Sequence, residues 1–293
     1  MGLYASVLFA GMGWNADAET VGRVYTALYY LCFLALPIAL SVMRRREILP
    51  ALRPNPISLP GVLLIVAMAL LGVFLVNDIT LIWSIPFQKL GFNVNAGGVD
   101  VPMDRLGLML SVLYMAVLPG ICEEFLFRGV LLSAFEAQGT RRAMVITSLL
   151  FMLMHGSLIG APAEFILGMI IASLVICTDS VYAGLIYHTV HNAATVLLQF
   201  VQQRMPSAEE IPADYLTAIG GLSGLLVLLV EVLLTAAMLR LMLRAFRTRA
   251  QLRGVQVQPR AKLGMRRGEW VLLIAGVTLT ALMYVTDIVN MLA

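Results

Sequence analysis

The stretch Leu118-Pro119-Gly120-Ile121-Cys122-Glu123-Glu124-Phe125-Leu126-Phe127-Arg128-Gly129 places two neighbouring glutamates inside a long apolar run. An unpaired carboxylate costs several kcal/mol or more in the hydrocarbon of a membrane, so two in succession indicate a functional site. Pro119 and Gly120 lie one turn before the pair. We expect them to kink the helix and to open room for water beside the carboxylates.

The composition of the whole chain supports a membrane setting for this stretch. Hydrophobic residues make up 60% of the 293 residues and charged residues 13%, and the mean hydropathy is +0.90. An ordinary soluble domain carries roughly a quarter charged residues. The three cysteines lie in apolar segments without paired spacing, which argues against disulfides or a zinc knuckle. The net charge of +3 is too small to indicate nucleic acid as a partner.

Apolar runs of spanning length divide the chain into about eight predicted transmembrane helices. They cover residues 21–43, 57–83, 105–136, 143–155, 163–178, 181–203, 216–245 and 269–291. The fourth and fifth are short, so they form either a tight hairpin or a partly re-entrant pair. The sequence therefore predicts an all-α, polytopic membrane protein with an intramembrane catalytic cavity. We assign residues 1–293 to a single domain, with a catalytic core at about 105–203 and flanking helices in 21–83 and 216–291.

Basic residues alternate between heavily and lightly charged loops. The heavy groups comprise Arg44, Arg45, Arg46 and Arg53, then Arg141 and Arg142, then the basic stretch 244–267. The intervening loops contain only Lys89, Arg105 and Arg204. By the positive-inside rule the heavy loops are cytoplasmic and both termini lie outside. The long basic loop is interpreted as solvated charge that faces anionic lipid.

All three histidines of the chain, His155, His188 and His191, follow the glutamate pair inside apolar segments. At about 1.5 Å of rise per residue, Glu123 lies roughly 20 Å and His155 roughly 18 Å from the cytoplasmic ends of their helices. His188 and Asn192 come out at about 11 and 16 Å by the same rise. We therefore expect these four side chains to meet in one layer near the middle of the bilayer.

Helical spacing predicts which of these residues share a face. Glu124 and Arg128 are four residues apart and can pair, whereas Glu123 is turned about 100° away and remains available to a cavity. His188 and Asn192 are also four apart, so both can point at one ligand atom. His191 is displaced from His188 by three residues, so it either joins that face or packs behind it.

Three motifs of this region resemble those of a known protease family. Glu123-Glu124-Phe125-Leu126-Phe127-Arg128, Phe151-Met152-Leu153-Met154-His155 and His188-Thr189-Val190-His191-Asn192 resemble, in order and spacing, the motifs EExxxR, FxxxH and HxxxN. These motifs characterise the CAAX prenyl endopeptidase type II and bacteriocin-processing (CPBP) family of intramembrane proteases. The resemblance covers about residues 105–203.

The resemblance implies an eight-helix glutamate protease and a set of catalytic roles. Glu123 and His155 would activate a water molecule. His188 and Asn192 would stabilise the oxyanion that forms on the cleaved carbonyl, a contribution that can reach several kcal/mol in a dry site. The sequence therefore predicts an endopeptidase that cuts near the C-terminus of a membrane-associated protein or peptide.

The remaining motif residues, Glu124 and Arg128, would brace the site. The resemblance points to chemistry without a cofactor or a metal. The expected partners are the substrate and the lipid bilayer. The compact loops and the basic linker are typical of a multi-pass protein of the bacterial inner membrane.

Three other readings stay open at this point. The first is a zinc protease with His155, His188 and a glutamate as ligands, although an HExxH helix is missing. The second is a non-catalytic scaffold or bacteriocin-immunity protein of the same fold. The third is a proton-coupled transporter, against which the lack of an inverted repeat argues. Cys122 fits either the myxosortase branch of the family or, in the simpler interpretation, a small apolar packing residue.

Overall fold

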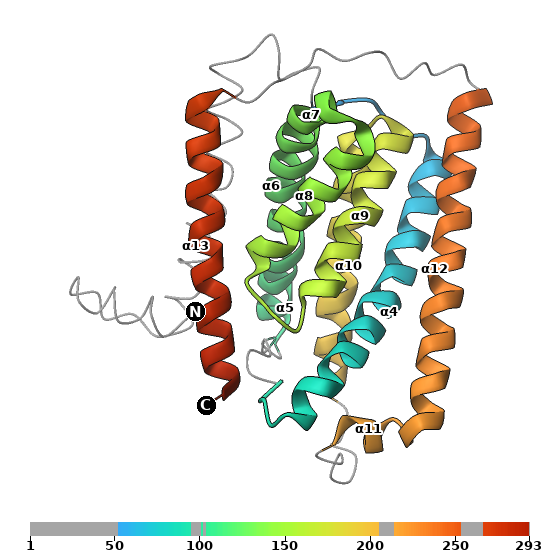
Figure 1. Ribbon diagram of the computed structural model, residues 1–293. Helices are drawn as coiled ribbons and strands as arrows, with labels where there is room; N and C mark the ends of the chain where they lie inside the picture. The colour runs from blue at the N-terminus through green and yellow to red at the C-terminus, as the bar shows by residue number, and fades with distance from the viewer. Residues whose placement is uncertain (1–51, 95–100, 102–103, 205–213, 253–265, 293) are drawn as a thin grey trace.

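The computed structural model describes residues 52–94, 101, 104–204, 214–252 and 266–292. Every regular element within these ranges is helical, as Figure 1 shows, which confirms the all-α polytopic fold class. The predicted segment 21–43 lies outside the described residues. Each of the other seven predicted segments contains a helix. Their bounds are α4 Leu59–Lys89, α5 Arg105–Val112, η1 Leu113–Val117, α6 Leu118–Glu124, η2 Phe125–Leu131, α7 Leu132–Phe135, η3 Glu136–Gln138, α8 Thr140–His155, α9 Ala161–Thr178, α10 Val181–Gln202, α11 Tyr215–Ala218, α12 Gly221–Leu252 and α13 Arg267–Leu292.

Five helices of the described residues are long and apolar enough to cross a membrane, fewer than the eight predicted spans. They are α4, the continuous run Arg105–Gln138, α9, α12 and α13. Helix α8 falls short because it has only 16 residues. Helix α10 has 22 residues, but it carries the polar residues His188, His191 and Asn192. These three side chains lower the hydropathy of α10 below that expected of a span.

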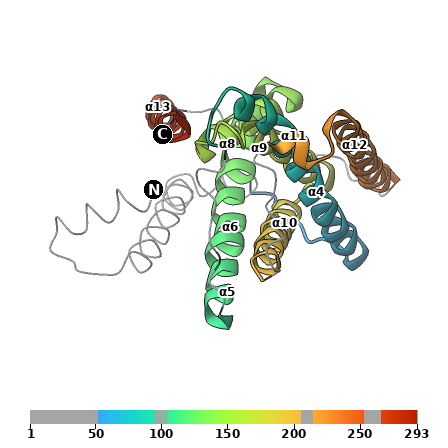
Figure 2. The same ribbon diagram turned by 90° about the horizontal axis from the view of Figure 1, so that it is seen from below.

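The inner helices form the core and the last two long helices lie at its edges. Of the most apolar stretch of α9, 56% is buried, against 6% for each of α12 and α13. Ile65 and Met68 of α4 pack with Phe151, Ile171 and other buried side chains in one apolar cluster. Figure 2 shows α12 and α13 on opposite sides of this cluster. The outer faces of α12 and α13 carry exposed leucines and valines, as expected for surfaces that contact lipid.

The ends of the helices that carry the heavy basic groups lie together at one end of the molecule, the upper end in Figure 1. Arg53 forms an ion pair with Glu136, and the carbonyl of Arg53 accepts a hydrogen bond from the amide of Val181 at 3.0 Å. Arg247 of α12 donates through Nε to Cys177 Sγ at 3.0 Å. The heavily basic loops of the sequence are therefore gathered at one end of the helices, as their alternation with lightly charged loops predicts.

The segments α8 and α9 form a hairpin whose tip stops short of the lower ends of α4, α10 and α12 (Figure 1). A hairpin at this position was one of the two arrangements considered from the sequence. Gly156 ends α8 in the left-handed conformation, with φ of 60°. The amide of Leu158 in the tip donates to Asp287 Oδ2 of α13 at 2.7 Å, and its carbonyl accepts from Trp83 Nε1 of α4 at 3.1 Å. Two neighbouring helices thus hold the tip in place.

The kink expected at Pro119 takes the form of a widened helical turn. A π-helical turn, η1, covers Leu113–Val117 and ends two residues before the proline, and a second one, η2, begins at Phe125 directly after the glutamate pair. Proline has no N–H to donate to the carbonyl four residues earlier, which is that of Met115. Insertions of this kind are frequent at functional sites of membrane and soluble helices. The glutamate pair therefore lies on a short α-helical piece between two widened turns.

Candidate active site

Glu124 and Arg128 form a fully buried ion pair. Arg128 Nη1 donates to Glu124 Oε1 at 2.8 Å, and both side chains are inaccessible to solvent. Arg128 Nη2 donates to the carbonyl of Gly168 at 3.2 Å, and the guanidinium lies 4.5 Å from the centre of the Phe151 ring. A buried charge is tolerated when it is paired and hydrogen-bonded in this way. The pair links the first motif helix to α9 and to the aromatic ring of the second motif.

His188 contacts the same oxygen of Glu124. Its Nδ1 lies 2.9 Å from Glu124 Oε1, and its ring meets the edge of Phe151 at a centroid distance of 5.7 Å. Because Glu124 already accepts from Arg128, we assign the carboxylate as the acceptor and Nδ1 of His188 as the donor. Glu124 thus connects α10 to the continuous helical run Arg105–Gln138, which is called the glutamate helix from here on.

Glu123 takes no part in the ion pair between Glu124 and Arg128. Its side chain is buried, and its Oε2 receives no hydrogen bond from the described residues. His155 and His188 lie near enough to interact electrostatically with its carboxyl group. One of the two glutamates is thus occupied by other side chains, and the other presents an oxygen that no neighbour in the described structure engages.

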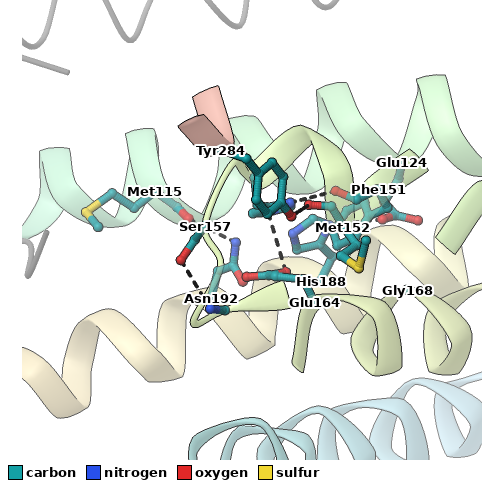
Figure 3. A network of polar contacts seen from close by, with 12 residues as sticks. Met115, Glu124, Phe151, Met152, Ser157, Glu164, Gly168, His188, Asn192 and Tyr284 are labelled. Atoms are coloured by element: carbon teal, nitrogen blue, oxygen red, sulfur yellow. Dashed lines mark hydrogen bonds and ion pairs between the residues drawn. The ribbon is translucent and has the colours of Figure 1, made fainter. Parts of the chain in front are cut away.

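His155 lies at the last residue of α8, beside the hairpin tip. Its Nδ1 lies 2.8 Å from the carbonyl of Phe151. A carbonyl only accepts, so Nδ1 carries a hydrogen and Nε2 is the nitrogen that faces outward from the helix. Nε2 lies 3.5 Å from Oε2 of Glu164, and both side chains are partly exposed. Glu164 and His188 are both drawn in the network of polar contacts of Figure 3.

Glu164 is a site residue that the sequence reasoning missed. It stands in the first turn of α9, within a segment predicted to lie in the membrane, and belongs to none of the three motifs. The depth argument that singled out Glu123 and Glu124 applies to Glu164 as well, and that signal could have found it. The sequence does not indicate that Glu164 lies beside His155, because that contact depends on the hairpin between α8 and α9.

Asn192 has a backbone partner on the glutamate helix. Its Nδ2 donates to the carbonyl of Met115 at 3.1 Å, as Figure 3 shows. This is the carbonyl to which Pro119 cannot donate. Asn192 of the third motif thus supplies a hydrogen bond to a carbonyl in the widened turn. An amide nitrogen carries two N–H groups, and this bond uses one of them. Asn192 is therefore anchored one turn away from His188 on α10.

Two other residues considered from the sequence lie away from this cluster. His191 is buried, and its ring stacks on Tyr187 at a centroid distance of 6.1 Å. It faces Gly72 of α4, which places it behind the face that carries His188. Cys122 is fully buried and is a free cysteine, in line with the simpler interpretation of a packing residue.

The side chains of the site come from the glutamate helix, α8, α9 and α10. Most of them carry carboxyl or imidazole groups. Among the described residues, no three His, Cys, Asp or Glu side chains converge in a way that could hold a metal ion. The zinc alternative would need such a group of ligands from the chain. Glu123 is a buried carboxylate within electrostatic range of His155 and His188, an arrangement that is suited to proton transfer.

Comparison with known proteins gives one family match, which covers the region of the three motifs. Residues 105–194 match the family described as Type II CAAX prenyl endopeptidase Rce1-like, and the matched region contains all three motifs. This match confirms the family resemblance. No curated protein and no solved structure matches the chain.

Proposed function

We propose that this chain, whose residues 105–194 match the Type II CAAX prenyl endopeptidase Rce1-like family, is an intramembrane endopeptidase of the glutamate type. The family is a protease family, and the apolar helices make the chain a multi-pass integral membrane protein. One observation carries the mechanistic part of the proposal. Glu123 is a buried carboxylate beside His155 and His188, and its Oε2 has no donor among the described residues.

In the proposed reaction, Glu123 and His155 activate a water molecule. The water loses a proton to this pair, its oxygen attacks the carbonyl carbon, and the carbonyl oxygen becomes an oxyanion. The proton then passes to the amide nitrogen as the carbon–nitrogen bond breaks, which yields a carboxylic acid and an amine. The balance is one peptide bond and one water consumed, with the catalytic groups restored.

His188 and Asn192 are proposed to stabilise the oxyanion. Both lie on one face of α10, and each is anchored by a residue of the glutamate helix, His188 by Glu124 and Asn192 by Met115. The second amide N–H of Asn192 is the donor that suits this role. Because Nδ1 of His188 donates to Glu124, Nε2 donates to an oxyanion only when the ring carries both protons. Glu124 and Arg128 are proposed to hold this arrangement rigid.

The substrate is proposed to be a membrane-associated protein or peptide that is cut near its C-terminus, with the bacterial inner membrane as the site of action. The family description supports a CAAX-type cleavage of this kind. A scaffold or immunity protein of the same fold would keep the helices but would not need the proton-transfer geometry around Glu123. The proposal therefore requires that cleavage depends on the carboxylate of Glu123.

The test compares protein termini in cells that contain the wild-type chain, Glu123→Gln or no chain. Mass spectrometry of membrane and secreted proteins should reveal new C-termini with the wild type only. The purified protein is then assayed in detergent, first on a quenched fluorescent peptide that ends in a farnesylated CAAX sequence. Glu123→Gln should abolish cleavage while the protein stays folded, and Glu269→Gln, in the first turn of α13, is the matched control. Equal cleavage by Glu123→Gln and the wild type would refute the mechanism.

The zinc alternative is decided on the same preparation. Metal content is measured, and activity is followed through chelation and metal addition. Unchanged activity after chelation supports the glutamate mechanism. Stoichiometric zinc, whose removal reversibly abolishes cleavage, would establish the zinc protease instead.

A further inference from the structure

The carboxylate of Glu164 faces the nitrogen of His155 that is not used in anchoring the ring. The two atoms, His155 Nε2 and Glu164 Oε2, are 3.5 Å apart. Oε2 is buried and accepts no hydrogen bond from the part of the chain that the structure describes. The hydroxyl group of Tyr284 donates to the carbonyl of Met152 at 3.1 Å and is therefore committed elsewhere.

The anchoring of His155 decides where this ring can gain a proton. Its Nδ1 already carries a hydrogen that is donated to the carbonyl of Phe151. Any further proton must therefore be taken up at Nε2, on the side of Glu164. The protonated ring would lie at ion-pair distance from a carboxylate in a site that is only partly open to solvent, where such an interaction is stronger than in water.

We infer that Glu164 is a positioning residue that acts through His155, an inference that rests on the proposed function. Its carboxylate holds the imidazole in the orientation in which Nε2 faces the site, and it stabilises the ring while the ring carries a proton. That proton comes from the attacking water and leaves to the nitrogen of the departing amine, so the step is balanced without another reactant. Glu164 itself contacts neither the water nor the substrate in this scheme.

An alternative role for Glu164 is local. Acidic residues in the first turn of a helix interact favourably with the helix dipole, and Glu164 stands in the first turn of α9. Glu269 likewise stands in the first turn of its helix, α13, where it accepts a hydrogen bond from the amide of Arg266. It is remote from His155, so Glu269→Gln reproduces the loss of helix-end charge without the loss of a partner for the imidazole.

The rank order of two substitutions separates the two roles. Glu164→Gln keeps the size of the side chain and removes the charge, whereas Glu164→Asp keeps the charge and shortens the side chain. If the charge acts on His155, Gln should lower kcat on the order of 10- to 100-fold with KM unchanged within about twofold, and Asp should retain more activity than Gln. Activity of Glu164→Gln equal to or above that of Glu164→Asp would overturn the inference, as would an equal loss in Glu269→Gln.

A second measurement is independent of cleavage. The chain has only three histidines, so protein labelled with ¹⁵N-histidine gives few signals, which a His155→Gln variant assigns. Glu164→Gln should shift the Nε2 signal of His155 and leave those of His188 and His191 in place. An unchanged His155 signal would overturn the inference even without a substrate. Cleavage that depends on Glu123 but not on Glu164 would remove this inference and leave the proposed function intact.

Discussion

Gly184 on α10 is the position where one added methyl group should damage the site most directly. A Cβ at this residue would lie 2.5 Å from Glu124 Oε2, 2.9 Å from Val175 Cγ2 and 3.1 Å from Ile171 Cγ2. All three distances are shorter than ordinary van der Waals contact. The Glu124 carboxylate and the Val175 side chain must both move, and the other oxygen of the carboxylate is held by Arg128 and His188.

The size of the effect of Gly184→Ala follows from these contacts. Overpacking costs about 1–3 kcal/mol, and the loss of one hydrogen bond to a charged group costs about 1.5–3 kcal/mol. The better helix propensity of alanine returns about 1 kcal/mol. The free energy of unfolding should therefore fall by about 1.5–5 kcal/mol. Since about 1.4 kcal/mol corresponds to a tenfold change in rate, displacement of Glu124 should slow cleavage by about 10- to 150-fold.

The assay measures the midpoint of thermal unfolding in detergent together with the cleavage rate. The control is Gly276→Ala in α13, where an added Cβ meets no described atom within 4 Å. This control should leave the cleavage rate unchanged and the midpoint equal or slightly higher. Wild-type stability and cleavage in Gly184→Ala would refute the reasoning, because Glu124 could then yield without loss of its partners.

Two further predictions concern α10 and the orientation of the chain. Asn192→Ala should reduce turnover on the order of 100-fold with little change in KM. His191→Ala alters a side chain packed behind the site, so its effect on turnover should be much smaller. An essential His191 together with a dispensable Asn192 would reverse the assignment. Cysteines placed at Gln251 and Ser207 should be labelled from outside the cell only at Ser207, as the distribution of arginines predicts, and labelling only at Gln251 would invert the topology.

Relations within one helix could be predicted from the sequence. The pairing distance of Glu124 and Arg128 and the separate direction of Glu123 follow from helix geometry alone, because residues four apart share a face and adjacent residues do not. The membrane setting and the fold class follow in the same way from composition and from the length of the apolar runs. These properties are local or additive along the chain, so no knowledge of the packing is needed.

Relations between helices were decided only by the tertiary structure. His188 and Asn192 were expected to point together at one atom, and in the structure each contacts a different residue of the glutamate helix. Glu164 meets His155 because the hairpin tip brings their helix ends together, and neither residue's spacing contains that information. Rotation and depth of one helix against another depend on how closely their surfaces approach, as at Gly184. That approach is a property of side-chain volumes from several helices at once, which the pattern along any single helix does not specify.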